Sequence, residues 1–152
     1  MFDVLVYLFE NYFEANIRPD QGTLARELSA AGFDQEDIER AFDWFGALEN
    51  MSRETESHAT REPDGFRIYA EQESKKISAE GRSFLLFLEQ AGVMLPSLRE
   101  LVIDRALALP DSPVTLEKIK WIVLMSLWNQ NKPNDYLFIA DAIFGDEHPT
   151  LH

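Results

Sequence analysis

Apolar residues recur at helical spacing from the first residues of the chain. A wide apolar arc is interrupted by a narrow polar stripe at Asp3, Tyr7, Glu10 and Glu14, whose spacings are four, three and four residues. An amphipathic pattern with so wide an apolar arc is typical of a helix that is mostly buried. The pattern therefore predicts a core helix over Phe2–Ala15. The less favoured alternative is that its aromatic residues line a groove that binds a partner.

Two more helices are expected within the first 50 residues. Asp20 is a candidate N-cap for a short helix through Leu28, and Gly32 is placed to end it in the left-handed conformation. Asp34 then opens a third helix, over residues 34–49. Its inward stripe is Ile38, Ala41, Phe42, Phe45 and Leu48. Helix, short helix and helix with tight connections is the order of a helix-turn-helix unit.

The middle of the chain is polar. Residues 51–65 have almost no apolar content and end in the turn dipeptide Asp64-Gly65, which predicts a solvated loop. Phe66, Ile68 and Ala70 then alternate with other residues, which predicts a short strand before a turn-rich stretch over 71–76. A strand that follows three helices is the arrangement of a winged helix.

Four further helices are expected in the second half. Their starts are marked by Ser78, by a capping box of Ser97 with Glu100, by Thr115 and by Pro133, and Gly92 and Gly145 end the first and the last. The inward residues of the last are Tyr136, Leu137, Ile139, Ala140 and Ile143. The fold expected is mainly α, a helix-turn-helix or winged-helix-like unit with a short β element, packed on a C-terminal helical subdomain. We expect an acidic three-helix unit over 1–50, a polar loop and possible β-wing over 51–77, and a helical subdomain over 78–152, in one compact domain overall.

Charge narrows the range of functions. The 152 residues include 27 acidic and 14 basic side chains, a net charge of −13, and the first 50 residues hold 11 of the acids and only 3 of the bases. Nucleic acid binding needs Lys and Arg to replace condensed counterions, so direct DNA or RNA binding is disfavoured. The chain has no cysteine, which excludes disulfides, thiolate metal sites and a cysteine nucleophile.

No targeting or membrane signal is recognised. The N-terminal segment lacks the basic region and the cleavage site of a secretory signal, and the longest apolar run elsewhere, over 121–128, is far shorter than the roughly 20 residues that span a bilayer. We expect a soluble cytoplasmic protein.

Catalytic and metal-binding motifs are also lacking. No phosphate-binding glycine loop or nucleophile elbow occurs, and the three histidines, His58, His148 and His152, have no metal-ligand spacing. A metal site of His148, His152 and Asp146 is the alternative to an ordinary frayed chain end, which is the favoured interpretation. Carboxylate pairs such as Glu71 with Glu73 cannot be distinguished from a solvated face. We therefore expect no enzymatic activity, no cofactor and no metal.

The third helix is the first candidate for a binding surface. As a recognition helix it would bring six acids and one base, Arg40, to the DNA phosphates, which is the wrong sign for a DNA reader. Its candidate partner-binding residues are Asp34, Glu36, Asp37, Arg40, Asp43 and Trp44. Trp44 has the residue type of an interface hot spot, but it lies in line with Ala41 and Leu48, which favours burial. The alternative surface for nucleic acid is Lys75, Lys76 and Arg82.

Six segments, in order, resemble one known family. They read MFDVLVYLFENY, AGFDQEDIERAFDW, FRIYAEQE, GRSFLLFLEQAGV, RELVIDRALAL and EKIKWIVLMSLWNQ, and together they are similar to the bacterial Smg family over nearly the whole chain outside 51–65. The resemblance implies a small cytoplasmic bacterial protein without an established activity, encoded near genes for a DNA-processing protein and peptide deformylase. The family has no agreed catalytic or binding residues, so none is carried over.

These observations favour a non-enzymatic acidic adaptor or regulatory protein. Its partner would be a protein with a basic surface, bound through the helix over 34–49, and proteins that handle nucleic acid are one class of candidate. Two alternatives remain: a winged-helix nucleic-acid-binding protein that works through Lys75, Lys76 and Arg82, and an acidic protein that mimics nucleic acid on a partner's cationic site.

Overall fold

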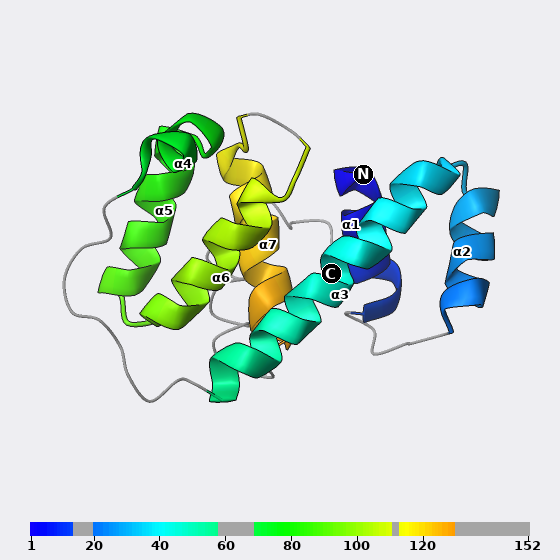
Figure 1. The fold of residues 1–152 in the computed structure, drawn as a ribbon, viewed down its shortest axis with the longest axis horizontal. Coiled ribbons are helices and arrows are strands. Elements are labelled where there is room, and N and C mark those ends of the chain that lie inside the picture. The colour runs from blue at the N-terminus through cyan, green and yellow to red at the C-terminus, as the bar shows by residue number, and fades with distance from the viewer. Residues whose placement is uncertain (14–19, 58–68, 111–112, 130–152) are drawn as a thin grey trace, which may run out of the picture. The chain divides into compact units, whose positions relative to one another are not determined.

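The described part of the protein is built from helices. A computed structural model describes residues 1–13, 20–57, 69–110 and 113–129 (Figure 1). The helices there are α1 (Phe2–Leu8), the π-helical turn η1 (Phe9–Phe13), α2 (Gln21–Ala30), α3 (Gln35–Ser57), α4 (Glu71–Lys76), α5 (Ala79–Gln90), α6 (Pro96–Leu107) and α7 (Leu116–Asn129). The chain divides into two compact units, an N-terminal unit over Met1–Glu49 and a C-terminal unit over Asn50–His152.

In the N-terminal unit, α2 begins after Asp20 as the sequence predicts and runs two residues past the predicted end at Leu28, to Ala30. The Asp20 carboxylate accepts a hydrogen bond of 2.8 Å from the Thr23 backbone N–H, which caps the helix. Hydrogen bonding to the Thr23 side chain, and then this backbone bond, lowers the pKa of Asp20. Gly32 has a φ of 103°, and the next residue, Phe33, donates its backbone N–H to the carbonyl of Leu28 at 3.2 Å. Only glycine takes such a φ without strain, so the chain turns sharply here and leads into α3.

The C-terminal unit is organised around α7. This helix packs against α5 and α6, α5 and α6 also touch, and α4 packs against α6 (Figure 1). Ser78 caps α5 through a 3.1 Å hydrogen bond from the Gly81 backbone N–H, and Thr115 precedes α7 as expected. The stretch 122–127 of α7 is buried all round, and its buried apolar residues, with one from the preceding turn, are Ile119, Ile122, Val123, Leu124, Met125 and Leu127.

One predicted cap in this unit is wrong. Helix α6 begins at Pro96 with Leu95 as its N-cap, and no side-chain hydrogen bond caps it. Ser97 and Glu100 therefore lie inside the helix instead of forming a capping box. Proline already has the φ of a first helical residue and has no N–H that needs a partner, so α6 can start one residue before Ser97.

The predicted β element and winged helix are wrong. The described residues contain no strand, and their one β-bridge is an isolated parallel pair of Ile77 with Val114. Of the expected strand, Phe66 to Ile68 lie outside the described residues, while Ala70 is the N-cap of α4 and donates its N–H to the Glu73 carboxylate at 2.9 Å. A three-residue alternation is a weak strand signal, and here the strong helix formers of 71–76, which were expected to be turns, dominate.

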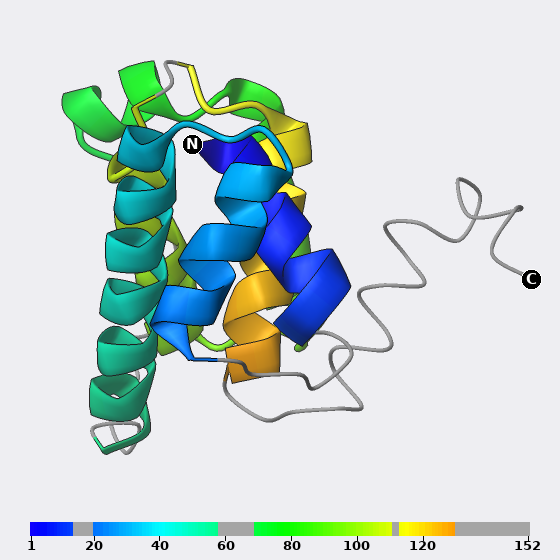
Figure 2. The ribbon, with the colours of Figure 1, turned by 90° about the vertical axis from the view of Figure 1, so that its right-hand side faces the viewer.

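The polar loop predicted over residues 51–65 is wrong for residues 51–57, which are helical. Helix α3 continues without a break to Ser57 and is the longest helix of the described chain, with 23 residues (Figure 2). Glu and Arg are good helix formers, and extending an existing helix needs no new nucleation, so a polar sequence does not end it. Residues 58–65 lie outside the described part of the chain.

Candidate interaction surface

The exposed side of α3 in the N-terminal unit is acidic. Ile38, Ala41 and Leu48 are buried on its inner side. Glu36, Glu39 and Asp43 are exposed, and their spacings of three and four residues place them along one side of the helix. Asp34, just before the helix, is exposed as well. We call Asp34, Glu36, Glu39 and Asp43 the acidic face.

Few cations neutralise this face. The Arg40 guanidinium lies 2.5 Å from a Glu36 carboxylate oxygen, but both side chains are well exposed, and such a surface pair adds about 0–1 kcal/mol. Gln35 donates a 3.4 Å hydrogen bond to Glu39, which leaves that charge in place. Among the described side chains, no cation lies within 4.0 Å of the carboxylates of Glu39 or Asp43.

Two of the residues predicted for this surface have other surroundings. Asp37 is half-buried, and its carboxylate lies 3.6 Å from the amino group of Met1. Trp44 is only 3% exposed and packs edge-to-face on Phe45, with 5.5 Å between ring centroids. Trp44 therefore belongs to the core and is not available as an aromatic anchor for a partner.

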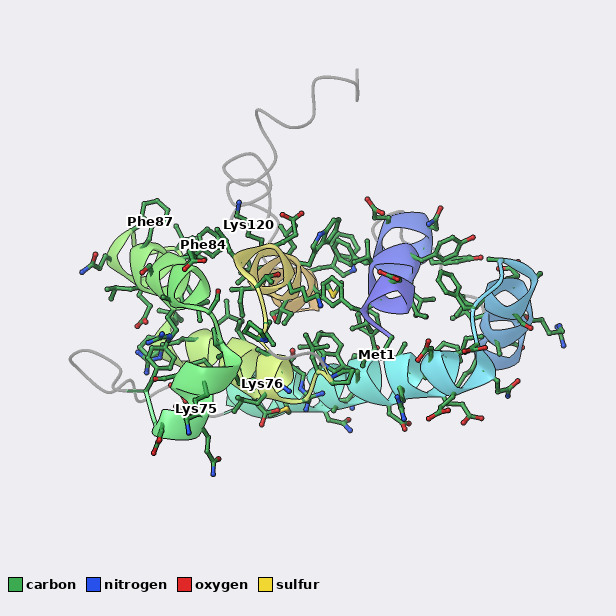
Figure 3. The ribbon with its side chains drawn as sticks, turned by 90° about the horizontal axis from the view of Figure 1, so that it is seen from above. Met1, Lys75, Lys76, Phe84, Phe87 and Lys120 are labelled. Carbon is green, nitrogen blue, oxygen red and sulfur yellow. The ribbon has the colours of Figure 1, made fainter. Side chains whose placement is uncertain are left out.

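The three basic residues predicted to contact nucleic acid lie in the C-terminal unit and interact with neighbouring groups. Lys75 pairs with Glu71 at 3.1 Å on the surface of α4. Lys76, which also lies on α4 (Figure 3), donates to the Leu109 carbonyl at 2.5 Å. Arg82 donates to the Ile77 carbonyl at 3.3 Å. Two of the three cations thus bind backbone carbonyl groups, which reduces what they can offer to phosphates.

One polar contact of the N-terminal unit was not predicted. The Tyr12 hydroxyl donates a short hydrogen bond to the Glu27 carboxylate, and this bond, with some desolvation, raises the pKa of Tyr12 to about 12. The Tyr7 ring touches two other rings, with centroid distances of 6.4 Å to Tyr12 and 5.4 Å to Phe33. The contact joins η1 to α2 across 15 residues of sequence, a separation that helical periodicity does not address.

A second unpredicted contact joins α5 to α6 in the C-terminal unit. The Arg99 side chain is 5% exposed, and its guanidinium lies 2.7 Å from the carboxylate of Glu89 and 3.0 Å from that of Glu100. A guanidinium this deeply buried needs such partners to offset the cost of leaving water. The sequence signal would have been an arginine on the buried side of α6.

The described residues offer no group of three or more His, Cys, Asp or Glu that could hold a metal ion. His58, His148, His152 and Asp146 lie outside them. In the same part of the chain, no helix is both long and apolar enough to cross a membrane.

Comparison with known proteins identifies relatives over the full length of the chain. The family model described as "Protein of unknown function (DUF494)" matches residues 1–152. The chain is 62% identical over 152 residues to "Protein Smg homolog" of Methylobacillus flagellatus, with all of both chains covered. The protein of the same name in Azoarcus sp. is 44% identical, with all of both chains covered. The one in Nitrosomonas europaea is 48% identical, over 97% of this chain and 98% of the relative. No solved structure matches it significantly.

Proposed function

The chain belongs to the DUF494 family of Smg homologues, and within this family of unknown function we propose that it is a non-enzymatic acidic adaptor that binds a basic protein. The observation that carries the proposal is the acidic face of α3, where exposed carboxylates share one exposed base, Arg40. A surface of one sign attracts a partner of the opposite sign and speeds their encounter. The cytoplasmic location expected from the sequence is part of the same proposal.

The position of Trp44 says what kind of binding to expect. Because this ring is buried, the acidic face offers charges without the aromatic anchor that an exposed Trp44 would have supplied. Exposed charges contribute mainly to the association rate and to the choice of partner, and their effect weakens as salt screens them. We therefore expect a complex that forms quickly and weakens as the ionic strength rises.

Quantitative affinity purification with mass spectrometry tests the proposal. The test variant combines Glu36→Gln, Glu39→Gln and Asp43→Asn, and leaves Asp37 unchanged because it lies near the Met1 amino group. The matched control combines Glu71→Gln, Glu80→Gln and Glu117→Gln, which removes three charges from exposed positions of the C-terminal unit.

The expected result is a loss of the same basic partner from the test variant, by about fivefold or more, with normal recovery by the control. Three exposed charges at about 0.3–1 kcal/mol each give a change of this size. Unchanged recovery by the test variant would remove the acidic face from the proposal. An equal loss from both variants would show that only the total charge matters.

A partner that binds nucleic acid allows a further distinction. An adaptor and the partner's nucleic acid can bind at the same time, whereas an acidic mimic occupies the cationic site and competes with duplex DNA. Titration of DNA into the purified complex separates the two cases, because displacement of the partner indicates the mimic.

A further inference from the structure

Helix α5 exposes large apolar side chains on the surface of the C-terminal unit. Phe87 is 54% exposed and Leu86 is 39% exposed. Phe84, half-buried, lies one helical turn from Phe87, and both point to the side of the unit where Lys120 of α7 projects (Figure 3). Single exposed apolar residues are ordinary, but two aromatic rings on one side of a helix form a surface that a neighbour can cover. We call Phe84, Phe87 and Lys120 the α5 patch.

We propose that the α5 patch is the docking surface for residues 133–145 of the same chain. These residues follow α7, which packs against α5, and the sequence predicts for them an amphipathic helix, whose apolar stripe needs a partner surface. Between Pro133 and Gly145 the segment has two acids, Asp135 and Asp141, and no base, which complements the charge of Lys120.

The connection to α7 is short enough for this docking. Residues 130–132 span at most about 10 Å when extended, so the segment must start close to the end of α7. A short connection between helices favours an antiparallel return along the preceding helix. The segment would therefore run back alongside α7 and α5.

The positions of side chains along the helix axes, called heights here, can be compared between α5, α7 and the segment. A Cβ atom on Gly81 would lie 3.0 Å from Ile119 Cγ1, and Ile77 forms a parallel bridge with Val114, so α5 and α7 run in the same direction with these residues side by side (Figure 1). We take the segment to start level with Asn129, the last residue of α7; at about 1.5 Å per residue, an antiparallel return from there brings Leu137 level with Phe87 along the helix axis. Asp141 comes within about one residue of the height of Lys120.

Engineered disulfides test the docking directly, because the full chain has no cysteine of its own. The test pair is Glu80→Cys with Gly145→Cys, which the matched heights bring together. The control pair is Gln90→Cys with Gly145→Cys, in which the first cysteine lies about 15 Å further along α5. That separation exceeds the roughly 7 Å between Cα atoms that a disulfide tolerates.

The expected result is an intramolecular disulfide in the test pair, formed at least about tenfold faster than in the control pair. Equal rates in the two pairs would overturn the proposal, because a segment without a fixed docking place meets both positions. A disulfide between two chains would assign the patch to a second copy and would also overturn it.

Three further substitutions in the test-pair background separate docking from chance proximity. Phe87→Asp should slow closure about fivefold or more, while the far-ultraviolet circular dichroism of the helices stays the same. Lys120→Glu should also slow closure, and adding Asp141→Lys should restore it by reversing the pair. If none of the three substitutions alters the rate of disulfide formation, the α5 patch plays no part in docking the segment.

Discussion

Two glycines inside helices have opposite surroundings. Gly46 lies on the exposed side of α3, and a Cβ atom there would meet no atom within 4 Å. Gly81 is buried where α5 meets α7, and the same atom would lie 3.0 Å from Ile119 Cγ1 and 3.2 Å from the Ser78 Oγ that caps the helix. Glycine is thus needed for close helix packing at Gly81, while at Gly46 it only weakens the helix.

Alanine at the two positions should change stability in opposite directions. Gly46→Ala should raise the free energy of unfolding by about 0.5–1 kcal/mol, because alanine favours the helix. Gly81→Ala should lower it by about 1 kcal/mol, because overpacking against the buried Ile119 outweighs the same gain. Urea unfolding measures both. Equal stabilisation by the two variants would show that Ile119 moves aside without cost.

The contact of α5 with α6 depends on a buried charge. Arg99 lies among apolar residues of α6, and Glu89 of α5, whose side chain is 17% exposed, reaches it across the helix pair. Removing one partner of a buried ion pair costs more than the pair contributes, because the other charge stays buried with less compensation.

The carboxylate of Glu89 should therefore matter to stability far more than that of an exposed glutamate. Glu89→Gln should lower the free energy of unfolding by about 2 kcal/mol. The control is Glu71→Gln on α4, which breaks the exposed pair with Lys75 and should change it by less than about 0.5 kcal/mol. The stabilities of the two variants are compared by their midpoints of denaturant unfolding. Similar small effects would mean that Glu100 or water replaces Glu89 beside Arg99.

Helix ends were predictable where they depend on local chemistry. Asp20 and Ser78 cap their helices, and Gly32 ends one, because each acts on backbone groups within a few residues. The strand expected at 66–70 was wrong, since strand formation needs a distant partner that periodicity cannot supply. The unbroken course of α3 past residue 50 was missed because polarity was taken for a loop signal.

For the whole molecule, charge is the dominant long-range term. The net charge is −13, and the first 50 residues contribute −8 from 11 acids and 3 bases. Like charges repel one another in the compact state, and the repulsion extends over about 30 Å at 0.01 M salt but only about 8 Å at 0.15 M.

Added salt should therefore stabilise the protein. Raising NaCl from about 0.01 to 0.15 M should increase the melting temperature by a few degrees, because the carboxylates are screened from one another. The variant with Glu36→Gln, Glu39→Gln and Asp43→Asn should respond less, and KCl should act like NaCl. Calorimetry at constant pH measures the shift. A melting temperature that falls with salt would show that ion pairs outweigh the repulsion.

The sequence by itself determined the helical class, several helix ends and the acidity of α3, because periodicity, capping and charge depend on residue type and near neighbours. The position of Trp44 in line with Ala41 and Leu48 also favoured its burial, which the structure confirms. Tertiary structure alone decided that Phe87 is exposed, that Tyr12 meets Glu27 and that Arg99 meets Glu89. These features depend on which distant residues pack together. Helical periodicity shows which face of a helix is apolar, whereas the packing of other helices decides how much of that face is covered.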